Sequence, residues 1–491
     1  SQVTTYDNVT PKSAAVTVDY SASPEGRGTV TASAETFRED DVVTFTAEAA
    51  TGSSFVRWEG SLVPDGQATQ NPLVLTLKAS GTVTAVFGAK YLVSTDGDDD
   101  NNDGRTAPFA TIEKAISVAQ PNDLISIGAG TFPLTAEVML DKAITVEGAG
   151  TNATFLTMGV TGIRAFTLSD ANAAVRNLTI SKFVAKLHGG AISMSKGLVE
   201  NCLITGCGPD GLSGPCGGGI NMSGGTVRNC TIEKCDVDAC SSGRYGGGIY
   251  MTGGRVEDSV FVGNVGTMEN SNGHGSALYV KNGTVVRCRF VGNRNYDGNE
   301  GGAAIHDDGG SVIDRCWFEG NSPSAVRLST GTLRNSVIVG GSNYQAFTAG
   351  VALTGNGKLF NCTFVGNVAG KDATGCSALS MTSGTAVNNV FFGNGNGNGG
   401  EVVSGGTFNT NIVENAVSRG TGNLLVDPQL ADAANGDYRL VFGSAAIDAG
   451  AALAEVTEDY AGVARPQGAA PDMGCYEYVD DGTVKVGVRV S

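Results

Sequence analysis

The chain has 491 residues, with 32 Lys and Arg against 49 Asp and Glu, which gives a formal net charge of −17. Its 72 glycines are about 15% of the residues, against roughly 7% in average proteins, and they follow no strict Gly-x-y period, which excludes collagen and predicts many tight turns. The acidic charge and the lack of a Lys/Arg run exclude a nucleic-acid partner, and no apolar run reaches the roughly 18 residues of a membrane-spanning helix.

The N-terminal segment alternates apolar and polar residues, which predicts short strands at 15–19, 28–32, 42–47, 55–58, 73–77 and 82–87. The order of its motifs, with Phe55-Val-Arg-Trp58 followed by Glu-Gly and later by Asn71-Pro-Leu, resembles the small bacterial surface repeat first described in internalins. The resemblance implies a spacer or binding module in residues 1–88. Since the chain starts at Ser1 rather than Met, we expect a mature product whose leader has been removed.

Residues 89–127 combine a strand, an acidic loop and a helix, and are predicted to cap a solenoid. Phe109, Ile112, Ala115, Ile116 and Ala119 fall on one helical face, as a helix that covers a strand edge requires. The loop offers hard oxygen ligands of the kind calcium takes, so both a Ca²⁺ site and a plain solvated loop fit Asp96, Asp98, Asp100, Asn102 and Asp103. The segment resembles the entry segment of many bacterial right-handed β-helix proteins, including pectate-lyase-like enzymes.

From about residue 189 one pattern recurs every 23 to 29 residues: a Gly-rich step, a short aliphatic strand, a polar turn and a second strand that ends in Gly-Asn. This period without helical spacing predicts an all-β fold, a parallel β-helix over residues 128–425, and the resemblance of the entry segment implies that the β-helix is right-handed. We expect at least eight stacked coils between residues 140 and 425, with Phe261, Phe290, Phe318 and Phe364 in one interior stack. A turn ladder is predicted for Asn264, Asn293, Asn321, Asn367 and Asn394.

The paired Gly-Gly-Ala-Ile and Phe-x-Gly-Asn signatures resemble the repeats of chlamydial polymorphic membrane proteins and related bacterial surface β-helices, which are adhesin-type proteins. Residues 426–480, with Asp427-Pro and Asp472-Met-Gly-Cys-Tyr-Glu477, resemble the choice-of-anchor type C-terminal module of such secreted proteins. Residues 481–491 contain an alternating run, 483–490, which we expect to be a strand available for homo-oligomerisation.

The 11 cysteines divide by their place in the coil. One column at an inward strand position is expected to hold free buried thiols: Cys202, Cys230, Cys288, Cys316 and Cys362. Four cysteines of the turns and loops are candidates for two disulfides in an oxidising compartment: Cys207, Cys216, Cys235 and Cys240. No Cys-x-x-Cys or His pair of zinc spacing occurs, so zinc chemistry is not expected.

The first strand of each coil presents one residue outward, and four consecutive coils place Tyr250, Tyr279, His306 and Arg327 in a line. Asp307 stands at an inward position where its neighbours are apolar, so it requires either a partner or a bulge in the strand. The outward positions around the second strand hold more candidate binding residues: Arg287, Arg289, Arg315 and Trp317. Aromatic rings and guanidinium groups on such a ladder suit sugar stacking and acidic-sugar binding, although an ordinary exposed sheet also favours aromatics.

These features predict a secreted or bacterial cell-surface protein that acts in adhesion, glycan binding or self-assembly, with a glycan or a host or cell-surface partner. The alternative is a polysaccharide lyase that cleaves a uronate-containing glycan by β-elimination, with Ca²⁺ as the one cofactor considered. In that alternative, Arg327 holds the carboxylate, and His306 and Tyr279 serve as base and acid beside Asp307.

Overall fold

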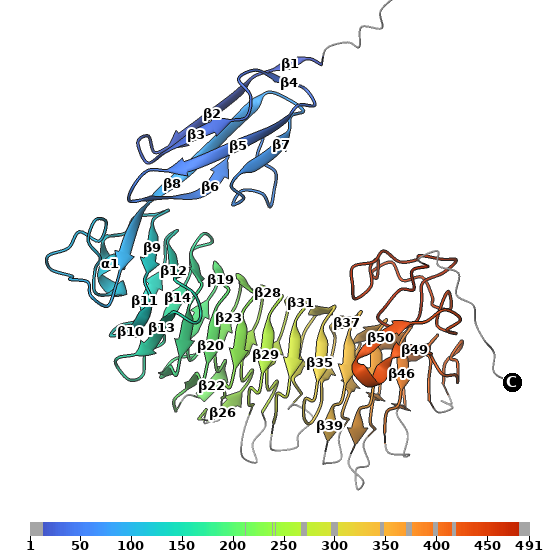
Figure 1. The fold of residues 1–491 in the computed structure, drawn as a ribbon. Helices are drawn as coiled ribbons and strands as arrows, with labels where there is room; N and C mark the ends of the chain where they lie inside the picture. Colours follow the sequence, from blue (N-terminus) through green and yellow to red (C-terminus); the bar gives the residue numbers. More distant parts are fainter. Residues whose placement is uncertain are drawn as a thin grey trace, which may run out of the picture. The chain divides into compact units, whose positions relative to one another are not determined.

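The computed structural model of the chain, shown in Figure 1, is almost entirely β-structure. It describes residues 13–211, 213–237, 239–240, 242–266, 273–295, 303–343, 348–369, 376–395, 401–414 and 419–480. Two units are distinguished, residues 1–128 with 142–147, and residues 129–141 with 148–491. Within the described ranges, no helix is long and apolar enough to cross a membrane.

The first unit contains the predicted small β module. Its strands are β1 (Ala15–Val16), β2 (Val18–Ser23), β3 (Gly28–Ala32), β4 (Phe37–Arg38), β5 (Val42–Ala49), β6 (Ser53–Glu59), β7 (Leu73–Thr76) and β8 (Gly81–Val93). β3, β5 and β7 form an antiparallel sheet, and β8 pairs with both β2 and β6. The alternating apolar residues meet in a core that includes Phe45, Trp58 and Phe87. β8 runs through the boundary expected at residue 88 and pairs with β9 (Leu124–Ile127).

The predicted helix is shorter than its pattern. α1 (Ile112–Val118) begins after Thr111, whose hydroxyl accepts from the Lys114 amide at 3.2 Å. The Asp99 carboxylate in turn accepts from the Thr111 amide and hydroxyl. Phe109, Ile112, Ala115 and Ala119 are buried as the helical face predicts. β12 (Thr145–Gly148) contributes its first three residues to this unit.

The second unit is a β-helix of three parallel sheets, which we call sheets I, II and III. Sheet I contains β10 (Gly130–Leu134), β13 (Thr154–Met158), β16 (Thr179–Ser181), β20 (Leu203–Thr205), β25 (Thr231–Glu233), β29 (Val260–Val262), β32 (Arg289–Val291), β35 (Trp317–Glu319), β38 (Val337–Val339), β42 (Thr363–Val365) and β46 (Val390–Phe392). Sheet II contains β11 (Val138–Leu140), β14 (Phe166–Leu168), β18 (Ile192–Met194), β23 (Ile220–Met222), β27 (Ile249–Met251), β30 (Leu278–Val280), β33 (Ile305–Asp307), β36 (Val326–Leu328), β40 (Val351–Leu353), β44 (Leu379–Met381) and β47 (Glu401–Val403). Sheet III contains β15 (Ala174–Arg176), β19 (Leu198–Glu200), β24 (Thr226–Arg228), β28 (Arg255–Glu257), β31 (Thr284–Val286), β34 (Val312–Asp314), β37 (Thr332–Arg334), β41 (Lys358–Phe360), β45 (Thr385–Val387) and β48 (Thr407–Asn409).

Short parallel pairs extend some of the turns. They join β17 (Val184–Ala185) to β21 (Gly208–Pro209), β22 (Ser213–Cys216) to β26 (Ser242–Arg244), and β39 (Ser342–Asn343) to β43 (Val368–Ala369). Successive strands of sheet I confirm the predicted stack of at least eight coils.

Like residues stack along the β-helix axis, as predicted. The ring centroids of Phe261 and Phe290 lie 4.7 Å apart, and those of Phe290 and Phe318 lie 5.0 Å apart. Ile338 occupies the same register between Phe318 and Phe364. The predicted asparagine ladder is also present, because the side-chain amide of Asn264 donates to Asn293 at 3.0 Å and that of Asn293 donates to Asn321 at 3.0 Å.

The cysteines confirm one prediction and correct another. Cys202, Cys230, Cys288, Cys316 and Cys362 are free and buried in one column. Cys207 and Cys235 are also free, so the prediction that they form disulfides is wrong. They occupy the inward turn position of the asparagine ladder: the Cys235 thiol donates to the Ile204 carbonyl at 3.8 Å, as the Asn264 amide donates to the Ile232 carbonyl at 2.9 Å. Cys240 is disulfide-bonded, and the Cys216 side chain lies outside the described residues.

The C-terminal segment packs on the outer face of sheet I. It contains the antiparallel pair β49 (Leu430–Asp432) and β50 (Asp437–Leu440), which are joined by the 3₁₀ turn η2 (Ala433–Asn435). Tyr438 and Cys475 pack against Val337 and Val339 of β38. A fully buried ion pair, Arg465 to Glu477 at 2.7 Å, holds the segment's own turns together. The run 483–490, expected to be a terminal strand, lies outside the described residues.

Candidate functional site

The four stripe residues occupy successive registers of sheet II. Tyr250 pairs with Tyr279, Tyr279 with His306, and His306 with Arg327. The rings of Tyr250 and Tyr279 stack with centroids 5.2 Å apart, and those of Tyr279 and His306 stack at 5.3 Å. The coil register therefore brings the predicted residues together in one line.

The middle of this line, Tyr279 and His306, is packed rather than open. Tyr245, in the turn before β27, lies with its ring centroid 4.7 Å from that of Tyr279 and 5.0 Å from that of His274. Only 7% of Tyr279 and 6% of His306 remain exposed. Tyr245 and His274 escaped the sequence reasoning because they precede the strands, where the repeat pattern does not fix which way a side chain points.

Two of the predicted catalytic residues, Tyr279 and Asp307, are bound to other protein groups. The Tyr279 hydroxyl donates to Asp308 Oδ2 at 2.6 Å, and burial together with that carboxylate raises the Tyr279 pKa well above its ordinary value. Asp307 is fully buried, and its carboxylate accepts the amides of Ser329, Thr330 and Gly331 at 3.1, 3.1 and 2.9 Å, as well as the Ser311 hydroxyl. Asp307 thus has the partners a buried carboxylate needs, and it holds the turn of the next coil.

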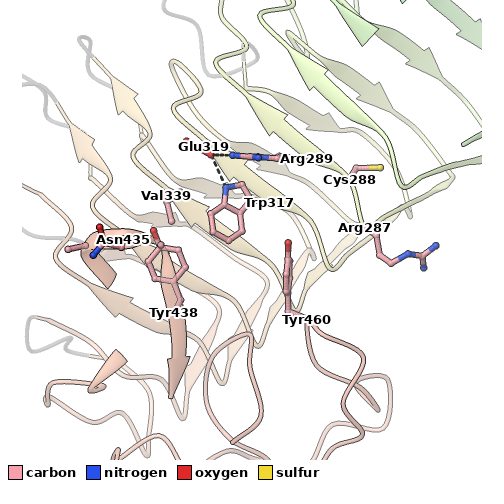
Figure 2. A pocket seen from close by; sticks show the side chains of 11 residues that line it. Arg287, Cys288, Arg289, Trp317, Glu319, Val339, Asn435, Tyr438 and Tyr460 are labelled. Atoms are coloured by element: carbon pink, nitrogen blue, oxygen red, sulfur yellow. Dashed lines mark hydrogen bonds and ion pairs between the residues drawn. The ribbon is translucent and has the colours of Figure 1, made fainter. Parts of the chain in front are cut away.

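A second set of predicted residues lines an open groove between sheet I and the C-terminal segment. Figure 2 shows Trp317 of β35 beside Tyr438 of β50 and Tyr460. The ring centroid of Trp317 lies 5.6 Å from that of Tyr438 and 6.3 Å from that of Tyr460. The groove has a volume of about 640 Å³, within the roughly 300–1,000 Å³ of small-molecule sites.

Charged side chains surround the Trp317 indole ring at its N–H edge. Glu319 accepts the Trp317 indole N–H at 3.1 Å and pairs with Arg289 at 2.5 Å, and the Arg289 guanidinium lies 6.0 Å from the Trp317 ring centroid (Figure 2). Hydrogen bonding to Arg289 lowers the Glu319 pKa, so this carboxylate stays ionised at neutral pH. Burial raises the pKa of Tyr460 to about 12, so its hydroxyl stays protonated.

The other two predicted arginines sit at the turn between sheets III and I, in the left-handed region. Arg287 has φ 53° and Arg315 has φ 54°, where most coils place Asn. Arg287 points away from Trp317 in Figure 2 and binds Asp258 through two nitrogens at 2.6 and 2.7 Å. Arg315 binds Glu458 of the C-terminal segment at 2.8 Å. Of the predicted binding residues outside the stripe, Arg287, Arg289 and Trp317 therefore line the groove, although the Arg287 guanidinium is bound to Asp258.

Sequence reasoning missed Tyr438 and Tyr460, which complete the groove. Both belong to the non-repetitive C-terminal segment, where no coil register predicts which residues approach sheet I. The only signal was the unusual tryptophan at an outward strand position, which needs apolar neighbours to cover it.

The acidic loop uses several of its polar side chains as local hydrogen-bond acceptors and donors. Asp98 accepts the amides of Asp100 and Asn101, and Asp103 accepts the amides of Arg105, Thr106 and Ala107. Asn102 donates to the Pro108 carbonyl, and the Asp96 amide donates to the Ser94 hydroxyl. The described residues contain no group of three or more His, Cys, Asp or Glu side chains placed to hold a metal ion. Calcium at Asp96, Asp98, Asp100, Asn102 and Asp103 stays a prediction.

Comparison with known proteins supports the fold. The family model of the right handed beta helix region matches residues 219–385, and that of the divergent InlB B-repeat domain matches residues 18–91. No curated protein matches the chain. Similar solved structures include pectate lyase Pel9A, at 14% identity over 79% of this chain and 96% of that chain with a TM-score of 0.44. They also include a rhamnogalacturonan lyase, at 13% identity over 70% of this chain and 91% of that chain with a TM-score of 0.36. A PL6 family polysaccharide lyase of Pseudopedobacter saltans is similar at 13% identity over 66% of this chain and 92% of that chain, with a TM-score of 0.32.

At these identities and TM-scores the solved structures do not bear on activity. Together with the coil geometry, the first family-model match leads to one conclusion: the chain contains a right-handed parallel β-helix, and its N-terminal module is similar to the divergent InlB B-repeat domain.

Proposed function

We propose that this is an extracellular or cell-surface β-helix protein that binds carbohydrate in the groove between sheet I and the C-terminal segment. One observation carries the proposal: Trp317, Tyr438 and Tyr460 gather in an open groove, with Arg289 and Glu319 at the polar edge of the indole. The N-terminal module fits such a protein as a spacer or a second binding module.

The groove matches the chemistry of a sugar, which has an apolar C–H face and a rim of hydroxyls. The part-exposed rings of Trp317 and Tyr460 offer flat apolar area for that face, while Tyr438, which is 7% exposed, packs against Trp317. The Glu319 carboxylate and Arg289 guanidinium are an acceptor and a donor for the hydroxyls. Because the indole N–H, Glu319 and Arg289 already bind one another, their side chains lose little rotational freedom when a ligand arrives.

The same groups favour binding over bond cleavage. A general acid or base works best with a pKa near the working pH. The Glu319 pKa is lowered and the Tyr460 pKa is raised to about 12, so neither group is set to exchange a proton at neutral pH. On sheet II, Tyr279 and Asp307 are bound to other protein groups. We therefore prefer glycan binding to β-elimination as the function.

The first test measures binding of neutral and uronate-containing polysaccharides by affinity electrophoresis or calorimetry. Trp317→Ala and Arg289→Gln are each expected to raise the Kd at least about tenfold, or about 1.4 kcal/mol. The matched controls are Phe442→Ala and Arg439→Gln, which change an exposed phenylalanine and an exposed arginine of the C-terminal segment away from the groove. Thermal unfolding of each variant shows whether the segment stays docked.

Two results would overturn the proposal. One is that no polysaccharide binds the wild-type chain, and the other is that folded Trp317→Ala and Arg289→Gln bind as tightly as their controls. New ultraviolet absorbance from unsaturated uronate on incubation with an acidic polysaccharide and Ca²⁺ would instead favour the lyase.

A further inference from the structure

We propose that His274 and His306 form a binding site for a divalent transition-metal ion, such as Zn²⁺ or Ni²⁺, on the outer face of sheet II. The Nδ1 atoms of the two imidazoles lie 3.3 Å apart, and the ring planes are nearly perpendicular at 87°. The two histidines are 32 residues apart in the chain, on neighbouring coils. Rules of short sequence spacing cannot find a pair that only the coil stacking brings together.

The distance fits two nitrogens bound to one ion. A Zn–N bond is about 2.0–2.1 Å long, so two ligands at a tetrahedral angle lie about 3.3–3.4 Å apart. The Nδ1 atoms are already at that separation, so the spacing of the two nitrogens matches that of two ligands of one ion.

The neighbouring rings hold both imidazoles in place. The ring of Tyr245 stacks on His274 with centroids 5.0 Å apart and planes at 16°, and the ring of Tyr279 stacks on His306 at 5.3 Å and 22°. Tyr279 is itself fixed by its bond to Asp308. Ligands whose orientation is set by surrounding groups lose less freedom on binding, which favours affinity.

The position also allows an ion to enter. His306 is buried, whereas His274 is partly exposed and opens the pair to solvent. Asp308, exposed beside Tyr279, adds a negative charge, and the acidic chain as a whole attracts cations. The two imidazoles are the protein ligands of the proposed site, and we expect water at the remaining positions of the coordination shell.

The ligand type predicts which ions bind. Imidazole nitrogen suits Zn²⁺, Ni²⁺ and Cu²⁺, whereas Ca²⁺ and Mg²⁺ prefer oxygen. This site is therefore distinct from the predicted calcium loop, and it assigns His306 a role other than that of a catalytic base.

The experiment titrates the full chain with Zn²⁺, Ni²⁺ and Ca²⁺ by calorimetry, alongside His274→Gln, His306→Gln and His188→Gln. His188, the third histidine, is the matched control. We expect one Zn²⁺ or Ni²⁺ ion per chain, a Kd raised at least about tenfold by either of the first two substitutions, and no change with His188→Gln. Excess Ca²⁺ should not displace the bound ion.

A second measurement keeps the test valid if a variant misfolds. Cu²⁺ bound to the wild-type chain should show electron paramagnetic resonance couplings to two imidazole nitrogens. The proposal fails if the wild type binds none of the three transition metals, if all variants bind alike, or if the bound Cu²⁺ shows no nitrogen coupling. Glycan binding by Trp317→Ala is a separate readout, so failure here leaves the groove proposal standing.

Discussion

Asp307 shows how one residue can look catalytic in sequence and be structural in the fold. A carboxylate at an inward position among apolar neighbours requires hydrogen-bond donors. Three consecutive amides of the next coil, residues 329–331, donate to it. The neighbouring strand positions in register, Val280 and Leu328, are aliphatic. The Asp307 carboxylate thus serves as the hydrogen-bond acceptor for the backbone amides of the turn at residues 329–331.

Replacement of Asp307 should therefore destabilise the protein without touching the groove. Asp307→Leu leaves two buried donors, the Gly331 amide and the Ser311 hydroxyl, without their acceptor at about 1–3 kcal/mol each. It also removes the acceptor of the part-buried amides of Ser329 and Thr330, so we expect the free energy of unfolding to fall by about 3–5 kcal/mol. Asp307→Asn keeps one carbonyl oxygen and should cost less. Chemical denaturation measures both, with Met251→Leu, in the same inward column, as the control. Equal stability of the Leu variant and wild type would show that these hydrogen bonds do not hold the turn.

At the scale of the strand, the features that the sequence predicts are those that recur once in every coil. The phenylalanine stack, the asparagine ladder and the column of buried cysteines were all predictable, because each coil places like residues at one register. The disulfides predicted for Cys207 and Cys235 are absent because both cysteines stand at the turn position of the asparagine ladder, where the side chain is buried and free. Tyr245, Tyr438 and Tyr460 lie outside the repeat, so their contacts depend on tertiary packing that no period encodes.

The last strand of sheet II breaks the aliphatic column. Glu401 of β47 pairs in register with Leu379, and it is 8% exposed. Among the described residues, neither of its carboxylate oxygens has a hydrogen-bond partner. Burial, with the nearby charge of Glu414 adding to it, raises the Glu401 pKa to about 7. A buried charge at the final coil disfavours stacking of a further strand on this edge.

The raised pKa of Glu401 determines whether the stability of the fold rises or falls with pH. The folded state holds the proton of Glu401 more tightly than the unfolded state, so this group's contribution to stability is present at low pH and is lost as the pH rises through about 7. Glu401→Gln should raise the melting temperature at pH above about 7, by an amount corresponding to at most about 3 kcal/mol, and change it little near pH 4. Thermal melts across this range test it, and an equal gain at every pH would contradict it.

At the scale of the whole molecule, the β-helix is a stack in which each coil contacts its neighbours, so its interior can be tested coil by coil. The column cysteines are suitable reporters because they lie on different coils: Cys288, Cys316 and Cys362 are free and no more than 2% exposed. Burial also raises the pKa of Cys316 and Cys362 well above the ordinary thiol value, which suppresses the reactive thiolate.

Native protein treated with iodoacetamide should therefore leave these three cysteines unmodified, and denaturant without reductant should expose all of them to the reagent. Peptide mapping by mass spectrometry reads the outcome at each position. Cys240, which is disulfide-bonded, serves as the internal control and should stay blocked until a reductant is added. If the coils unfold together, the three thiols become reactive over the same range of denaturant. Modification of Cys288 in native protein, or a disulfide at any of the three, would show that the column does not face the interior and that the coil register is wrong.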